Sequence, residues 1–237
     1  MGKIVAIGGG EISKHETSKI DKYILMLSNK QKPKLLFLPT ASNDNLPYIQ
    51  LVNEYFTKLG CVVDVLDVYS TTYTDEEIRK KIFTTDIIYV GGGDTSSMMD
   101  KWRELHIDVY LKDAYQRNIV LAGLSAGAIC CCLYGCSDSN SFIDPNDKSF
   151  CKVYGLNFIK VAICPHYDEE GRKAFDNMIL EDDLIQGIAL ENNTALVEEN
   201  KAYYIIKSNS NKKAFLLRKI DGKLEKTELS EYMPINL

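Results

Sequence analysis

Histidine is scarce in this chain of 237 residues, where only His15, His106 and His166 occur. Chemistry that needs an imidazole therefore has three candidates. Long apolar runs are absent too: the run near the start ends at residue 7, too short for the core of a signal peptide or for a membrane span. We therefore expect a soluble, cytoplasmic protein without a membrane partner.

Clustered positive charge and metal-binding spacings are also missing. The formal net charge is −5, which argues against a nucleic-acid partner, because phosphate binding needs grouped Lys and Arg. Seven cysteines occur, but no two have the C-x-x-C spacing of a zinc site. An odd number of cysteines without a secretion signal indicates reduced, mostly buried thiols. We expect no metal.

Short apolar runs alternate with segments of helical periodicity through the first two-thirds of the chain. Uninterrupted apolar runs are typical of parallel strands that are buried on both faces. We therefore predict a three-layer, doubly wound α/β fold with a mostly parallel sheet, in one domain over residues 1–237. The predicted strands are 3–7, 35–38, 62–66, 87–90 and 119–122, and the predicted helices are 18–27, 46–59, 74–83, 95–104 and 109–117.

The last third of the chain has a different character. Residues 136–151 are polar and irregular, which predicts a long loop, and residues 168–180 suggest a further helix. Three later runs alternate more strongly, so we predict short antiparallel strands at a sheet edge, at 195–198, 202–206 and 214–217.

Ser125 is the candidate nucleophile. It lies in Gly-Leu-Ser-Ala-Gly, directly after the predicted strand 119–122 and before a helical run. A serine in such a sharp strand-to-helix turn has its hydroxyl raised above the carboxyl edge of the sheet, where doubly wound folds bind ligands. A helix that begins at Ala126 would direct free N–H groups and its positive end at an anion formed there. The alternative is a glycine-rich turn that serves only packing.

His166 is the candidate base, because a serine hydroxyl is un-ionised at neutral pH and needs one. It ends an apolar run, Val-Ala-Ile-Cys-Pro-His, which places it at the same kind of sheet edge as Ser125. His15 lies in a polar loop and His106 between two predicted helices, so neither shares this context.

The third member of a triad should be a carboxylate that orients the imidazole. Asp138, Asp144 and Asp147 lie in the polar loop between Ser125 and His166. We favour Asp138, which follows the helix predicted after the nucleophile, over Asp144. The remaining aspartates are interpreted as turn formers or loop caps.

Backbone donors for an oxyanion are predicted on either side of the nucleophile. One is the Ala126 amide. The other source is the glycine-rich turn 91–95, in which Gly92 and Gly93 follow the predicted strand 87–90. Asp94 in this turn is a candidate for substrate binding or for a helix cap. The earlier Gly8-Gly9-Gly10 run is not interpreted as a dinucleotide site, because Ser13 stands where that motif has glycine or alanine.

Five motifs together resemble the peptidase E family of serine peptidases, which includes aspartyl dipeptidases and cyanophycinases. In chain order they are Ile-Gly-Gly-Gly near the start, Leu-Pro-Thr-Ala-Ser at 38–42, Val-Gly-Gly-Gly-Asp-Thr at 90–95, Gly-Leu-Ser-Ala-Gly-Ala at 123–128 and Pro-His-Tyr at 165–167. The resemblance spans roughly residues 1–200 and implies a flavodoxin-like fold similar to that of class I glutamine amidotransferases.

The resemblance also implies roles for individual residues. Ser125 would be the nucleophile and His166 the base, with the glycine turn at 92–93 and Ala126 as oxyanion donors. It implies a preference for an N-terminal aspartate. No motif identifies the residues that bind this aspartate, and Arg172, just after His166, is the candidate to bind its carboxylate bidentately. A helix-surface role for Arg172 is the alternative.

The expected function is thus hydrolysis of short peptides by a triad that uses no cofactor, in a monomer or homodimer. Three alternatives remain: a cyanophycinase-like enzyme, an esterase of the α/β-hydrolase kind, and a non-catalytic ligand-binding protein. The esterase predicts a histidine near the C-terminus, yet none follows His166.

Overall fold

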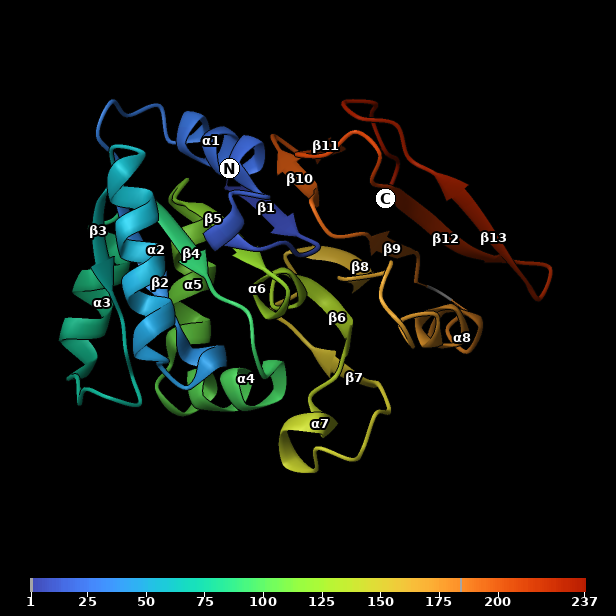
Figure 1. The fold of residues 1–237 in the computed structure, drawn as a ribbon, viewed down its shortest axis with the longest axis horizontal. Helices are drawn as coiled ribbons and strands as arrows, with labels where there is room; N and C mark the ends of the chain where they lie inside the picture. The colour runs from blue at the N-terminus through green and yellow to red at the C-terminus, as the bar shows by residue number, and fades with distance from the viewer. Residues whose placement is uncertain (1, 184) are drawn as a thin grey trace.

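The computed structural model describes residues 2–183 and 185–237, whose strands form two sheets (Figure 1). The first sheet has the order β11-β10-β1-β5-β4-β2-β3. Its parallel strands are β1 (Lys3–Ile7), β2 (Lys34–Leu38), β3 (Val62–Val65), β4 (Ile87–Val90) and β5 (Val120–Leu124). The antiparallel strands β10 (Thr194–Glu199) and β11 (Ala202–Lys207) complete one edge, as the alternating sequence there predicted.

Helices cover both faces of this sheet. Their bounds are α1 (Ser18–Leu27), α2 (Leu46–Lys58), α3 (Asp75–Phe83), α4 (Thr95–Glu104) and α5 (Ile107–Gln116). On β1, Val5 and Ile7 pack with α1 and α2, whereas Ile4 and Ala6 share a core with α3, α4 and α5. Burial of successive residues on opposite faces explains the uninterrupted apolar runs. The predicted α/β class is confirmed.

The second sheet was not predicted. It has the order β13-β12-β9-β8-β6-β7, with parallel pairing only among β6, β8 and β9. The strands are β6 (Cys132–Ser137), β7 (Cys151–Tyr154), β8 (Ile159–Cys164), β9 (Gly187–Leu190), β12 (Ala214–Ile220) and β13 (Lys223–Glu228). Helix α8 (Ala174–Leu180) packs on this sheet through Phe175, Met178 and Ile179.

Two predicted elements are corrected by this sheet. The helix after Ser125 is only one turn, α6 (Ala126–Ile129), and the chain then enters β6 rather than continuing as a helix. The predicted strand 214–217 is real, but it pairs with β9 and β13 and not with the first sheet. The loop 138–150 contains a single short helix, α7 (Asn140–Ile143), and extends away from the body of the molecule (Figure 1).

The cysteines match their prediction. All seven are free thiols, and all except the half-buried Cys151 are buried. Among the described helices, none is both long and apolar enough to cross a membrane.

A carboxylate is buried between α1 and α2. The Asp21 side chain accepts hydrogen bonds from the Thr17 and Tyr55 hydroxyls, both at 2.8 Å and both on Oδ2, and its Oδ1 has no hydrogen-bond partner among the described residues. Burial raises the pKa of Asp21 to about 6, because the charged form loses hydration that two hydroxyls only partly replace.

Replacement of Asp21 tests this shift. A folded-state pKa above the unfolded value means that the folded protein holds this proton more tightly, so the contribution of Asp21 to stability is greatest at low pH and is lost as pH rises through about 6. Between pH 3 and pH 8, we expect the unfolding free energy of the wild type to fall relative to Asp21→Asn by about 3 kcal/mol, because the pKa of Asp21 rises on folding from 3.8 to about 6. Urea denaturation at several pH values measures the difference.

The exposed Asp113 on α5 provides the control. Asp113→Asn should follow the pH dependence of the wild type, and the same pH dependence in Asp21→Asn would show that Asp21 ionises normally.

Candidate active site

Ser125 occupies the strand-to-helix turn that the sequence predicted. It follows β5 directly and precedes α6, and its backbone has φ 57° and ψ −106°. Positive φ is uncommon for a serine and marks strained backbone of the kind found at functional sites. The Ser125 amide donates to the carbonyl of Ile7, 3.0 Å away at the end of β1, which fixes the turn.

The glycines on either side of Ser125 are required by close backbone contacts. A β-carbon on Gly123 would lie 2.5 Å from the Gly127 carbonyl oxygen, and one on Gly127 would lie 2.4 Å from the carbonyl oxygen of Val90. Any larger residue would push α6 away from β4 and β5. The Gly-x-Ser-x-Gly pattern is therefore explained by the packing of the turn itself.

His166 follows β8 and is held by the same end of β1. Its amide donates to the Gly8 carbonyl at 2.7 Å, next to the Ile7 carbonyl that holds Ser125, and its own φ is 55°. The imidazole lies against Gly9, where a β-carbon would be 2.5 Å from two ring atoms. Successive residues of one segment thus anchor the backbones of both predicted catalytic residues.

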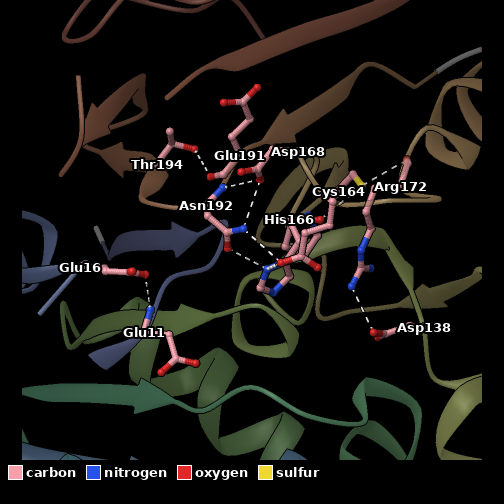
Figure 2. Close-up of polar contacts among 12 residues, drawn as sticks. Glu11, Glu16, Asp138, Cys164, His166, Asp168, Arg172, Glu191, Asn192 and Thr194 are labelled. Atoms are coloured by element: carbon pink, nitrogen blue, oxygen red, sulfur yellow. Dashed lines mark hydrogen bonds and ion pairs between the residues drawn. The ribbon is translucent and has the colours of Figure 1, made fainter. Parts of the chain in front are cut away.

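An amide and a carboxylate hold the imidazole, and Figure 2 shows the Asn192 side chain directed towards His166. His166 Nδ1 lies 2.9 Å from Asn192 Oδ1 and 3.1 Å from Glu169 Oε1. The Asn192 amide nitrogen donates to Glu169 at 3.1 Å and to Asp168 at 3.2 Å, so its oxygen is the atom that faces the ring. Both neighbours of Nδ1 are then acceptors. Nδ1 must carry the proton, and Nε2 is left as the basic nitrogen.

Glu169 is the charged member of this group. The hydrogen bond from His166 lowers the pKa of Glu169 to about 2; burial opposes the shift, and the Asn192 amide adds to it. The carboxylate is therefore ionised at neutral pH and accepts from the neighbouring ring. Asp168 in turn accepts from the Asn192 backbone amide at 2.8 Å and pairs with Lys212, which fixes the asparagine.

Asp138 does not take the position predicted for it. Its Oδ2 contacts Arg172 Nη2 at 3.1 Å, and no contact joins it to His166. The physical reason is β6: with the helix after Ser125 cut to one turn, this strand carries Asp138 to the side where Arg172 lies. Asp144 and Asp147 accept from the amides of Asn146 and Ser149, so both are turn formers.

Sequence reasoning missed Glu169, Asn192 and Asp168. Two of them lie two and three residues after the predicted base, and Asn192 follows β9, beside β8. The position of Asn192 after a buried strand could have suggested a site residue. However, the pairing of β9 with β8, which brings it to His166, could not be predicted from a local pattern.

The predicted oxyanion donors lie in different surroundings. A β-carbon on Gly92 would be 3.4 Å from the Ser125 β-carbon, so this residue touches the nucleophile, and its amide is 3.5 Å from the Tyr48 hydroxyl. The Ala126 amide begins α6 and has no hydrogen-bond partner among the described residues. Gly93 instead packs against the backbone of Ala41. A helix of one turn contributes little dipole, so these amides act locally.

Asp94 is a helix cap. Its Oδ1 accepts from the amides of Ser96 at 3.0 Å and Ser97 at 3.4 Å, at the start of α4. The capping role that the sequence allowed for this residue is therefore present.

Arg172 forms part of a cavity of about 530 Å³ that also borders Glu169. The side chain is 5% exposed, donates from Nη1 to the Cys136 carbonyl at 3.2 Å and stacks 4.7 Å from the centre of the Phe150 ring. Glu170 and Lys148 add one charge of each sign to the lining. Arg172 is thus a buried cavity residue and not a helix-surface arginine. Within the described part of the chain, no group of three His, Cys, Asp or Glu side chains is arranged to hold a metal ion.

A strained serine between a buried strand and a helical turn, with a histidine whose backbone is anchored to the same segment, is typical of α/β hydrolytic enzymes. The model of peptidase family S51 matches residues 4–206, and the chain belongs to this family. It is 34% identical over 219 residues to the uncharacterized peptidase YgaJ of Bacillus subtilis, covering 91% of each chain. An uncharacterized peptidase of Listeria monocytogenes is 26% identical over 65% of this chain and 75% of its own.

Solved structures share the fold of this chain. A peptidase from an acI-B1 Actinobacterium has a TM-score of 0.76 at 20% identity, covering 100% of this chain and 97% of that one. A putative peptidase E protein of Listeria monocytogenes has a TM-score of 0.65 at 20% identity, covering 87% and 98%. The resemblance to the peptidase E family is confirmed.

Proposed function

We propose that this chain is a serine peptidase that hydrolyses short peptides, with dipeptides carrying an N-terminal aspartate as preferred substrates. The observation that carries the proposal is the arrangement around His166. Asn192 and Glu169 both accept at Nδ1, so Nε2 is the basic nitrogen, and the successive carbonyls of Ile7 and Gly8 hold the backbones of Ser125 and His166. A peptidase needs such a base to activate a serine hydroxyl.

In the proposed mechanism, Ser125 attacks the peptide carbonyl while His166 takes its proton. The tetrahedral oxyanion is held by the Ala126 amide and by the glycine turn, with Gly92 the nearer of its two candidates and Gly93 the other. His166 then gives the proton to the leaving amine, and water hydrolyses the acyl-enzyme by the reverse transfers. Glu169 stabilises the imidazolium, and Asn192 holds its orientation. These two residues replace Asp138 in that role.

The Arg172 cavity supports the preference for aspartate. An N-terminal aspartate carries an ammonium and a carboxylate close together, and this cavity presents charges of both signs. A guanidinium has five N–H donors, so a second carboxylate can bind beside Asp138. Glu170 is a candidate partner for the ammonium.

A cytoplasmic location stays a prediction.

Replacement of the nucleophile is the primary test. Ser125→Ala should lower kcat on Asp-X dipeptides by on the order of 10⁶, because the hydroxyl forms the acyl-enzyme. A fluorophosphonate probe should label the folded wild type at Ser125 and leave the variant unlabelled, as mass spectrometry would show. Folded wild type that resists the probe and cleaves no peptide would favour the non-catalytic alternative.

Glu169→Gln tests the charged partner of the base. The variant keeps the shape of the side chain and loses the charge that stabilises the imidazolium, so kcat should fall by about 10²- to 10⁴-fold with little change in KM. Steady-state kinetics on Asp-Ala measures both constants. Glu181→Gln, at an exposed position after α8, should match the wild type. An equal fall in kcat in both variants, or a rise in KM with kcat unchanged, would mean that Glu169 has no part in the mechanism.

Arg172→Gln tests the aspartate preference. Loss of a charge-assisted hydrogen bond should reduce kcat/KM for Asp-Ala by about 10- to 100-fold. The value for Ala-Ala should change little, because that peptide has no side-chain carboxylate. The exposed Arg103 on α4 provides the control Arg103→Gln, which should change neither value. Equal losses on both peptides would mean that Arg172 supports the fold and does not select the substrate.

A further inference from the structure

A second cavity, of about 290 Å³, lies next to the turn that carries the nucleophile and has no part in the mechanism above. Its lining includes Leu124, the residue before Ser125, and Gly92, which touches Ser125. None of the residues that line the Arg172 cavity lines this one. The site around Ser125 therefore has two separate cavities, one beside Glu169 on the side of the base and one beside the nucleophile.

The interior of the second cavity is apolar. Ile12, Leu51, Leu124 and the ring of Tyr48 form its walls, and Gly10 adds only backbone. The Tyr48 hydroxyl lies 3.5 Å from the Gly92 amide, and burial raises the pKa of Tyr48 to about 12, so the phenol is neutral. Substrate pockets are commonly of this kind, with apolar walls and few polar groups.

Charge is found only at the exposed part of the lining. Glu11 and Ser13 are both exposed, and the Glu11 carboxylate accepts from the Ser13 hydroxyl at 3.0 Å. An acidic residue in this position disfavours a carboxylate side chain in the cavity. An uncharged side chain that enters between Leu51 and Leu124 meets no such penalty.

The walls are fixed before any ligand binds. Tyr48 and Leu51 lie on α2, and Ile12 is buried in the short 3₁₀ turn Ile12–Lys14. Gly10 is enclosed, because a β-carbon there would lie 2.4 Å from Asn193 Oδ1. A preformed apolar cavity binds a matching side chain with little cost in ordering.

We infer that this cavity binds an apolar side chain of the substrate residue that follows the scissile bond. The inference rests on the proposed function: with the aspartate in the charged Arg172 cavity and the peptide bond at Ser125, the next side chain reaches the apolar cavity. The preferred substrates then have leucine or a similar residue after the aspartate.

Leu51→Trp, which fills the cavity, tests the inference. The probes are the amides Asp-Leu-NH₂ and Asp-Gly-NH₂, which differ only in the side chain after the aspartate. For the wild type, kcat/KM for cleavage after aspartate should be at least about tenfold higher with leucine. In Leu51→Trp this ratio should approach one, mainly through loss on the leucine substrate. Leu46→Trp, on the 62% exposed first residue of the same helix, should keep the wild-type ratio.

Binding to a protein without the nucleophile separates this inference from the proposed function. Calorimetry with Ser125→Ala should show tighter binding of Asp-Leu-NH₂ than of Asp-Gly-NH₂, and the double variant Ser125→Ala/Leu51→Trp should lose the difference. That result would support the cavity even if the wild type cleaved neither amide. Equal affinities in both proteins, or no binding of Asp-Leu-NH₂ to Ser125→Ala, would overturn the inference and leave peptidase activity as a separate question.

Discussion

Two adjacent carbonyl groups at the end of β1 determine the geometry of the site. The Ile7 carbonyl accepts from the Ser125 amide and the Gly8 carbonyl accepts from the His166 amide. These residues belong to strand ends in different sheets, so the end of β1 is the place where the sheets meet at the site. Backbone hydrogen bonds of this kind set positions without depending on side-chain rotamers. The serine and the histidine are therefore positioned by the main chain of a third segment.

The residues around His166 determine which nitrogen of its ring carries the proton. An imidazole has two nitrogens, and only the distribution of donors and acceptors decides which one carries the proton. Here the orientation of Asn192 is fixed by two carboxylates, and it leaves an oxygen for the ring. Residues from the turn after β8 and from the turn after β9 must meet for this to occur. The second sheet, which pairs those strands, is thus as necessary to the site as the first.

Most of the first sheet could be predicted from local sequence patterns. The apolar runs before Ser125 and around residues 36 and 88 predict buried strands, and the periodicity of residues 74–83 predicts a helix. Each of these elements is present. The second sheet depends on pairings between distant segments, such as β6 with β8, and on an interruption of the helix after one turn. No local signal in the run of three cysteines distinguishes a buried helix from a buried strand.

The same limit explains the partial prediction of the site. Ser125 and His166 could be predicted from the sequence around them, because each stands at the end of an apolar run. Asp138 was chosen by its position in the chain, and the structure pairs it with Arg172 through contacts that sequence distance cannot reveal. Asn192 was missed because an amide is not expected where a carboxylate is sought, although Glu169 supplies the charge three residues from the ring.

The backbone of the two reactive residues has a consequence for how such a protein can change. Ser125 and His166 both have positive φ, a conformation that glycine adopts freely and that other residues adopt at a cost. At these two positions, the residues that provide the reactive groups therefore lower the stability of the fold. In a relative that no longer needs the activity, glycine at positions 125 and 166 would relieve the backbone strain, and the hydroxyl and the imidazole would then be lost.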